Sequence, residues 1–467
     1  MSYSEDYYDD SHNSQFDNED LQSKVDICKE YVSAGQIYAY LDNIEETIQL
    51  CMEYDCNSDG IYLVDAVLEI APYNSEFWQY KGVLLNNMFE FEEAYDCFNR
   101  ALSLNPSDVE SLVNKSIAED NLGMYDEAQA SLNKALEIEP GNEEAIFNLG
   151  VLHIRKNNYD EAIANFKKAV EIDPEYTEAW YELGFCYENS DMFEEALEAY
   201  DRFLAVEAYS SAGWYNRGIV LIRMGSFEKA INSFELSIAI KDDFSSAWFN
   251  CGVGYANLGK FEDARKAFNK AAQLDDEDET IWYNLAQVYL ELKNYKKALA
   301  CYNNALKLDS EYFEAYLERG YCQLLSGNKR AAYDDLFNAI LIVNSESVPE
   351  EEPSEIEIKL RITFLQSLLK NDFKNPVLWA DLGDAHFDAG QFTESRAAFN
   401  KSLKLDIKAA ETHYGKARTE LFEGRIAEAV NGFKNAFVLN PELQTKFNNE
   451  FPDVLTSRLF IELTQNN

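Results

Sequence analysis

Large apolar residues recur along the chain at a fixed interval, and the pattern predicts paired amphipathic helices. Trp stands at positions 180, 214, 248 and 282, each 34 residues after the last, and Trp78 lies three such steps before Trp180. A period of this length accommodates two helices of about three to four turns and the turns that connect them. The chain is therefore expected to be a stack of helix hairpins.

Eight consecutive units fit this 34-residue frame, from Ser75 to Glu346, and the positions of a unit are numbered from 1. Position 8 is small in every unit and position 20 is Ala in every unit, so the two helices of a hairpin can cross closely. Position 24 is large and apolar, and its side chain is expected to fill the space beside the small pair. Burying this apolar surface stabilises the fold by about 25 cal/mol per Å². The residues at position 24 are Phe98, Leu132, Phe166, Tyr200, Phe234, Phe268, Tyr302 and Leu336.

The unit around Trp180 carries the most complete motif. Trp180 is followed by Leu183, Gly184 and Tyr187 on the first predicted helix and by Ala196 on the second. This order resembles the signature of the tetratricopeptide repeat family. The resemblance implies an all-α fold, a right-handed superhelical solenoid of about ten to eleven antiparallel helix hairpins.

The regions outside the eight units define the expected domain organisation. The expected order is an acidic disordered tail over 1–20, a degenerate helical N-terminal cap over 21–74, eight repeats over 75–346, an acidic linker and a non-repeat helix over 347–375, two further repeats over 376–443, and a C-terminal capping helix over 444–467. Within 347–375 the stretch VPEEEPSE precedes the amphipathic stretch IEIKLRITFLQSLL. The solenoid is expected to bend there, either because a repeat has been lost or because the segment is a joint or a docking loop for a partner.

The charge of the chain restricts the classes of molecule that it can bind. The 84 acidic and 40 basic residues give a net charge of −44, which repels a phosphate backbone and argues against nucleic acid. The charge either keeps a long surface soluble or favours partner proteins with basic segments. No apolar run approaches the roughly 20 residues that cross a bilayer, so no membrane insertion is expected. Eight scattered Cys residues without a CxxC pair, and no secretory leader ahead of them, favour a cytoplasmic location.

An asparagine ladder marks one side of the first helices. Positions 2, 5, 6, 9 and 13 lie about one or two turns apart and so share a side. Asn occupies position 6 or position 13 in seven of the eight units, at Asn114, Asn148, Asn216, Asn250 and Asn284, and at Asn87, Asn121, Asn189 and Asn257. An amide both donates and accepts hydrogen bonds, so such a ladder can pair with the backbone of an extended peptide whatever its side chains. The ladder resembles the one that lines the peptide groove of repeat-bearing sugar transferases, although Asn at position 6 is common throughout the family.

Aromatic residues stand beside the ladder. They are Phe147, Tyr181, Tyr215, Phe249 and Tyr283 at position 5, and Phe185 at position 9. One interpretation is an apolar floor beneath a bound peptide on the concave face. The alternative is that these rings pack neighbouring first helices together.

The sequence offers no catalytic or cofactor chemistry. The repeats and caps use nearly the whole chain, the four His residues are isolated, and the Cys residues lack metal-ligand spacing. We therefore expect no enzyme activity, no cofactor and no metal site. The favoured function is a scaffold or adaptor that binds extended segments or helices of other proteins in the concave groove. The alternatives are a structural subunit that uses the convex face and the 347–375 break, and a peptide-sensing regulator.

Overall fold

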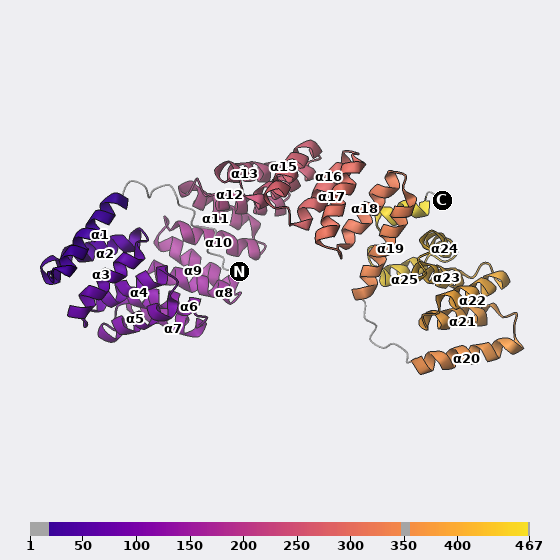
Figure 1. The fold of residues 1–467 in the computed structure, drawn as a ribbon, viewed down its shortest axis with the longest axis horizontal. Coiled ribbons are helices and arrows are strands. Elements are labelled where there is room, and N and C mark those ends of the chain that lie inside the picture. The colour runs from indigo at the N-terminus through magenta and orange to yellow at the C-terminus, as the bar shows by residue number, and fades with distance from the viewer. Residues whose placement is uncertain (1–17, 347–354, 466–467) are drawn as a thin grey trace. The chain divides into compact units, whose positions relative to one another are not determined.

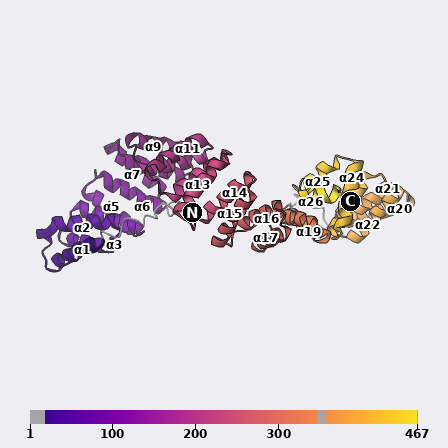
Figure 2. The ribbon, with the colours of Figure 1, turned by 90° about the horizontal axis from the view of Figure 1, so that it is seen from above.

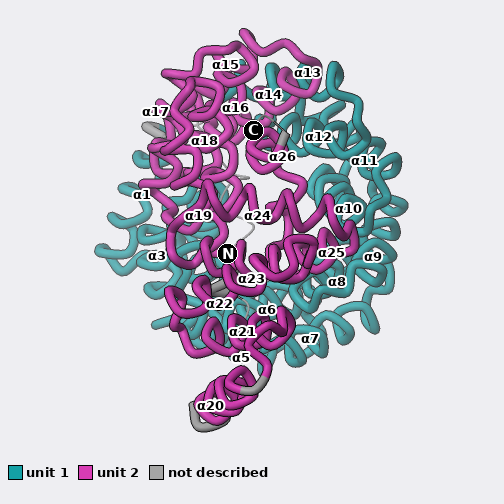
Figure 3. Tube along the Cα trace, turned by 90° about the vertical axis from the view of Figure 1, so that its right-hand side faces the viewer, with its two compact units in different colours: residues 1–242 teal, residues 243–467 magenta. Residues whose placement is uncertain are grey.

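The computed structural model describes residues 18–346 and 355–465. Every regular element in this part of the chain is a helix, so the expected all-α class is confirmed (Figure 1). The chain divides into two compact units, residues 1–242 and residues 243–467, which are described separately (Figure 3). No helix within the described residues combines the length and the apolar character that a bilayer crossing needs.

Unit 1 begins with a helical cap ahead of the first full repeat. The cap consists of α1 (Asn18–Ser33), the 3-10 helix η1 (Ile37–Tyr40), α2 (Leu41–Glu53) and α3 (Asn57–Ile70). Its apolar residues form one buried cluster that continues into the next helix. The predicted disordered tail lies outside the described residues, except for 18–20, which begin α1.

Five hairpins complete unit 1, and consecutive hairpins pack side by side (Figure 2). We call them repeats 1 to 5, each with a first helix of 13 residues and a second helix of 14. They are α4 (Ser75–Asn87) with α5 (Phe91–Leu104), α6 (Val109–Asn121) with α7 (Tyr125–Ile138), α8 (Glu143–Arg155) with α9 (Tyr159–Ile172), α10 (Thr177–Asn189) with α11 (Phe193–Val206), and α12 (Ser211–Arg223) with α13 (Phe227–Ile240).

Unit 2 continues with repeats 6 to 8 and ends with a rearranged segment. Repeats 6 to 8 are α14 (Ser245–Asn257) with α15 (Phe261–Leu274), α16 (Glu279–Glu291) with α17 (Tyr295–Leu308), and α18 (Phe313–Leu325) with α19 (Lys329–Glu346). The rest of the unit is α20 (Glu355–Asn371), repeat 9 of α21 (Pro376–Asp388) and α22 (Phe392–Leu405), repeat 10 of α23 (Ala410–Phe422) and α24 (Ile426–Leu439), and the short helices α25 (Leu443–Glu450) and α26 (Arg458–Gln465).

Each hairpin turns at position 15, where the backbone is left-handed. Gly occupies this position in six of the ten repeats, for example Gly259 with φ +70°. The other four carry Phe89, Asn157, Asp191 and Lys293 with φ between 56° and 63°. An L side chain is disfavoured in this conformation, so these four turns carry strain that glycine would relieve.

The recurring Trp joins five of the repeats to the turn before them. The indole Nε1 of Trp180 donates to the carbonyl oxygen of Pro174 at 3.0 Å. Trp78, Trp214, Trp282 and Trp379 each make the same bond to the residue six positions earlier, at 2.9 to 3.0 Å. The period seen in the sequence is therefore the period of an inter-repeat hydrogen bond.

The predicted pairing of small and large residues inside the hairpins is confirmed in five of repeats 1 to 8. A Cβ atom placed on Gly82, Gly150, Gly184, Gly218 or Gly252 would come within 2.5 to 2.8 Å of the aromatic ring at position 24 of the same hairpin. Those rings are fully buried. Repeat 8 differs, because the nearest atom to Gly320 belongs to Leu459 of α26, at 2.5 Å from such a Cβ.

The break after repeat 8 changes the order in which helices stack. The helix predicted from IEIKLRITFLQSLL is α20, which packs on α21, whereas α19 of repeat 8 packs on α24 and α26. Repeat 8 therefore meets the last helices of the chain and not the next ones in sequence (Figure 1). The acidic linker itself falls largely outside the described residues.

The C-terminal cap differs from the single helix expected over 444–467. Residues 451–457 form turns that separate α25 from α26. Pro452 has no N–H to donate, and Asp453 adopts φ 64°, so a helix cannot run through them. Phe451 and Val454 turn inward at this point and are buried.

Candidate functional site

The candidate site lies on the surface formed by positions 2, 5, 6, 9 and 13 of the first helices, which we call the first-helix face. In unit 1, α4, α6, α8, α10 and α12 contact one another in sequence, and in unit 2 the same holds for α14, α16 and α18. Direct contact between successive first helices makes this face continuous within each unit. All the sequence-predicted site residues lie on it.

The asparagine side chains are held by their own helices. Asn148 donates from Nδ2 to the carbonyl oxygen of Glu144 at 2.9 Å. The same bond to the residue four positions earlier, at 2.8 to 3.1 Å, is made by Asn114, Asn121, Asn189, Asn250, Asn257 and Asn284. This bond uses one N–H and fixes the side chain, so at Asn121 and Asn148 the amide oxygen and the second N–H are the groups that a ligand could engage.

Two of the predicted asparagines depart from this pattern. Asn216 donates to the hydroxyl oxygen of Tyr181 at 2.8 Å, and Asn87 donates to Oδ1 of Asn57 at 3.4 Å. The structure therefore joins Asn216 and Tyr181 in one pair across repeats 4 and 5.

The position-5 aromatics pack into the hairpins as well as lining the face. Phe147 lies 5.4 Å from Phe166, and Tyr181 lies 5.9 Å from Tyr200, between ring centroids. Tyr215, Phe249 and Tyr283 contact their own position-24 rings at 5.5 to 6.1 Å, and Phe185 contacts Tyr159 at 6.4 Å. All these predicted rings are only half-buried. They support the packing of the hairpins and leave an apolar edge on the first-helix face.

Four of the predicted residues converge on a pocket of about 400 Å³ between α6, α8 and α10. We call it the repeat 2–4 pocket. Its lining includes Asn121, Asn148, Phe147 and Tyr181 of the predicted set, with apolar Ile117, Leu132, Val151 and Leu152 and polar Ser116, Asp120, Arg155, Glu178 and Glu182. The remaining predicted residues of unit 1 lie outside this pocket, and those of unit 2 belong to the other compact unit.

Charged groups give the pocket an unusual wall. Nε of Arg155 lies 3.5 Å from Oδ2 of Asp120. Burial raises the pKa of Asp120, while Arg155 opposes that rise. Burial also raises the pKa of Glu182 to about 7, again with Arg155 acting in the opposite direction. A carboxyl whose pKa lies near neutrality can donate a hydrogen bond or accept one, according to the ligand.

The charged wall of the pocket was not among the features that the sequence predicts. Glu182 interrupts the asparagine ladder at position 6, and this interruption was the signal available in the sequence. Asp120 and Arg155 carried no such signal, since they stand at positions 12 and 13 of different repeats and meet only when α6 and α8 stack.

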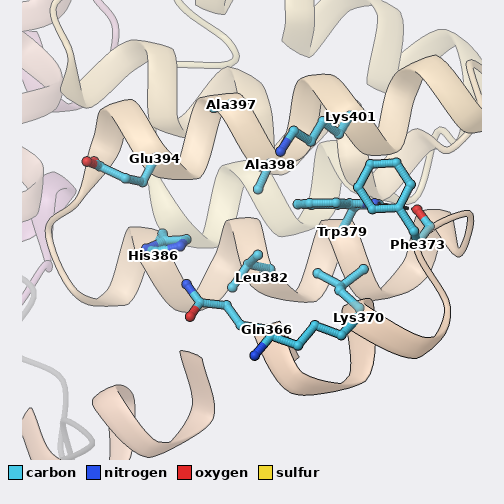
Figure 4. Close-up of a pocket in the computed structure, with 11 residues that line it drawn as sticks. Gln366, Lys370, Phe373, Trp379, Leu382, His386, Glu394, Ala397, Ala398 and Lys401 are labelled. Atoms are coloured by element: carbon cyan, nitrogen blue, oxygen red, sulfur yellow. Dashed lines mark hydrogen bonds between the residues drawn. The ribbon is translucent and has the colours of Figure 1, made fainter. Parts of the chain in front are cut away.

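A second pocket, of about 420 Å³, lies between α20, α21 and α22 (Figure 4). Leu382 and Ala398 lie in its wall, and Nζ of Lys401 sits 4.1 Å from the ring centroid of Trp379. Nδ1 of His386 pairs with Oε1 of Gln391 at 2.7 Å. None of the predicted site residues lies here. The loss of the repeat frame over 347–375 was the sequence signal for this pocket. A single helix packs there on repeat 9, in the place where a complete two-helix repeat would otherwise stand.

The thiols and acids form no metal-binding cluster within the described residues. All eight Cys are free, and seven are buried. Burial raises the pKa of Cys97, Cys301 and Cys322 to about 11, which keeps them as thiols near neutral pH. In the part of the chain that the structure describes, no three His, Cys, Asp or Glu side chains are grouped to hold a metal ion.

Comparison with known proteins identifies the repeat. Family models described as TPR repeat or tetratricopeptide repeat match residues 75–108, 122–164, 153–191, 187–246, 254–293, 280–312 and 380–438. No curated protein sequence matches the chain.

Several solved structures resemble parts of the chain. A crystal structure of MamA is 30% identical, covers 35% of this chain and 95% of its own, and has a TM-score of 0.34. YrrB, described as a TPR protein with an unusual peptide-binding site, is 22% identical, covers 43% of this chain and 99% of its own, and has a TM-score of 0.38. PilF of Pseudomonas aeruginosa is 18% identical, covers 47% of this chain and 97% of its own, and has a TM-score of 0.40.

The family models and the helix hairpins lead to the same assignment. The matched segments cover most of repeats 1 to 7 and, after a gap over residues 313–379, most of repeats 9 and 10. The 34-residue hairpins, the small residues at position 8 and the recurring Trp occur in the same segments. The chain therefore belongs to the tetratricopeptide repeat superfamily.

Proposed function

We propose that this protein is a non-catalytic scaffold that binds extended or helical segments of partner proteins on the first-helix face of unit 1. The observation that carries the proposal is the repeat 2–4 pocket. It combines fixed amides, an apolar floor and carboxyl groups in a volume of about 400 Å³ on the face that the sequence singles out. This volume and an apolar lining with a few placed polar groups are typical of ligand-binding clefts, and side-chain pockets of this kind give specificity in peptide recognition.

Each part of the pocket has a distinct role in the proposal. Asn121 and Asn148 offer amide groups to the ligand backbone, because their own helices hold them in place. The rings of Phe147 and Tyr181 and the side chain of Val151 receive an apolar side chain. The interaction is therefore expected to tolerate different ligand sequences that share a backbone edge and one apolar residue.

The charge of the chain bears on the choice of partner. Glu178 and Glu182 line the pocket, and the chain as a whole carries a net charge of −44. Partner segments with basic residues are favoured by this field, which speeds their encounter with the site. A cytoplasmic location is part of the proposal, since eight free thiols suit a reducing compartment.

The test compares two asparagines that make the same bond on different faces. Asn148 lies in the pocket on a first helix, and Asn165 lies on the second helix α9, where its Nδ2 donates to the carbonyl oxygen of Glu161 at 2.8 Å. Asn148→Ala with Asn121→Ala is the pocket variant, and Asn165→Ala is the matched control. Exposed polar substitutions of this kind change the free energy of unfolding by about 0.5 kcal/mol or less.

The measurement is quantitative affinity capture of proteins from a native cell extract on the wild-type chain and the two variants, with peptides of the captured proteins then titrated in solution. The proposal expects the pocket variant to lose partners that the control keeps, with equal melting temperatures. Retention of the same partners at the same affinity by all three proteins would contradict it.

A second candidate function rests on α20. Its side chains Leu360 and Phe364 are 65% and 63% exposed, although Leu365 and Leu369 on its other side are buried against repeat 9. An exposed apolar stripe at the break in the repeats favours a structural subunit that meets its assembly through the 347–375 region. Leu360→Asp with Phe364→Asp would then release partners that the pocket variant retains.

A further inference from the structure

The C-terminal helix places an arginine on the first-helix face of unit 2. Arg458 of α26 donates from Nη2 to Oε1 of Gln287 at 3.0 Å and forms a short ion pair with Glu318. Its Nη1 lies 3.5 Å from Oε1 of Glu291. The guanidinium also stands 5.0 Å from the ring centroid of Tyr321.

The four residues around Arg458 occupy positions of the first-helix face. Glu318 is at position 6 and Tyr321 at position 9 of repeat 8, while Gln287 and Glu291 are at positions 9 and 13 of repeat 7. The sequence-predicted Tyr283 belongs to the same network, because its hydroxyl oxygen accepts a hydrogen bond from Nε2 of Gln287 at 2.9 Å. The columns predicted to bind a peptide thus hold a segment of this chain.

The residue after Arg458 fills a gap that the other repeats close internally. In five of repeats 1 to 8, an aromatic ring at position 24 covers a glycine at position 8, whereas repeat 8 has Leu336 at position 24. The side chain of Leu459 takes that place over Gly320. Leu459 and Phe460 are 0% and 2% exposed, so these side chains are as fully buried as the core of a hairpin.

We infer that the first-helix face of repeats 7 and 8 is a second binding site, specific for a helical segment in which Arg is followed by Leu and Phe, and that the C-terminus is its built-in ligand. A partner segment of the same chemistry competes with α26 for the site. This inference is independent of the repeat 2–4 pocket, which lies in unit 1.

The geometry selects arginine over lysine. One guanidinium reaches two carboxylates and an amide oxygen from different helices and at the same time faces an aromatic ring. An ammonium group is a compact point charge that cannot span those acceptors in one plane. The gap over Gly320 adds a requirement for a branched aliphatic residue directly after the arginine.

The experiment uses the full chain and a fluorescent peptide with the sequence of residues 453–465. In one variant, Arg458→Glu with Leu459→Asp, the built-in ligand is weakened. In the matched control, Arg425→Glu, the lost ion pair joins residues of one exposed helix turn, Arg425 and Glu428. Binding is measured by fluorescence anisotropy, and folding by thermal melts.

The peptide is expected to bind the weakened variant at least about tenfold tighter than wild type or the Arg425 control, since only the weakened variant has an open site. Peptides with Lys or Glu in place of the arginine should bind at least about tenfold weaker than the native peptide, because a charged partner in the site is lost or misplaced. Glu318→Gln added to the weakened variant should reduce binding to a similar extent.

A second measurement on the wild-type chain covers the case in which the weakened variant unfolds. Saturating native peptide should increase hydrogen–deuterium exchange in 458–465, and the Glu peptide should not. The inference is overturned if a folded weakened variant fails to bind the native peptide or binds the Glu peptide equally well. It is also overturned if the variant unfolds and exchange in wild-type α26 does not respond to the native peptide.

Discussion

The pairing of a small residue with a ring inside each hairpin can be tested in repeat 3. A Cβ on Gly150 would lie 2.6, 2.7 and 2.9 Å from three ring carbons of Phe166. Carbon atoms normally approach to about 3.5 to 4.0 Å, so the ring would have to move by about 1 Å within a full core. Repeat 2 shows an alternative solution, since Ser116 and Leu132 occupy the same two positions and are both buried.

The expected magnitudes follow from these contacts. Gly150→Ser overpacks the hairpin at a cost of about 1–3 kcal/mol, offset by about 0.5 kcal/mol because serine favours a helix more than glycine does. Phe166→Leu alone leaves a small cavity and costs about 1–2 kcal/mol. The double variant reproduces the pair of repeat 2, so we expect it to be more stable than the sum of the single changes by about 1–2 kcal/mol.

The assay must report on repeat 3, because repeats unfold with some independence. Hydrogen exchange of peptides from α8 and α9, measured across a urea series, gives the local free energy of opening for wild type, both single variants and the double variant. If the change in opening free energy of the double variant equals the sum of the two single changes within about 0.5 kcal/mol, the idea that the two positions share one volume is refuted.

Three further predictions concern the turns and the charged groups. Lys293→Gly should raise the free energy of unfolding of unit 2 by about 0.5–1 kcal/mol in urea titrations, since it relieves the backbone strain of a left-handed turn with φ 58°. An unchanged or lower free energy of unfolding would contradict this prediction. Because burial raises the pKa of Glu182 to about 7, the neutral form favours folding, and stability should fall as pH rises from about 4.5 through 7. Glu182→Gln should remove that fall and exceed wild type by about 1–3 kcal/mol at pH 8 in parallel urea titrations, whereas identical pH profiles would argue against it. Arg319→Met should lower the free energy of unfolding by about 3 kcal/mol at pH 7 and by less at pH 4, as measured in urea. The reason is that Asp335 is 3% exposed and would lose the guanidinium that lies 3.1 Å from its carboxylate. A decrease that does not depend on pH would count against this reasoning.

Much of the fold could be predicted because the repeat is a local rule. Gly184 and Tyr200 lie within one unit of the frame, so their contact follows from the spacing alone. The same is true of Asn148, whose place on the first-helix face depends only on its position in a helix. A sequence period specifies the contacts within a hairpin and between neighbouring hairpins, so these are the contacts that the sequence predicts.

Contacts that break the period could not be read from the sequence. Arg458 and Glu318 meet across 140 positions, and no spacing rule connects them. The same holds for the stacking of α19 on α24 in place of α20, which depends on a segment where the frame fails. Glu182 could be noticed as an interruption, but the rise in its pKa comes from burial among side chains of other helices.

The contact between α26 and repeat 8 has a mechanical consequence. Along the chain, repeats 9 and 10 lie between the two partners, yet the ion pair of Arg458 with Glu318 joins them directly. Tension applied at the C-terminus is therefore carried first by this contact, and the intervening helices bear load only after it ruptures. The segment between the two partners, which are 140 positions apart, could then extend to a length of up to about 480 Å at roughly 3.4 Å per residue. Rupture of this one contact therefore has to precede the extension of repeats 9 and 10.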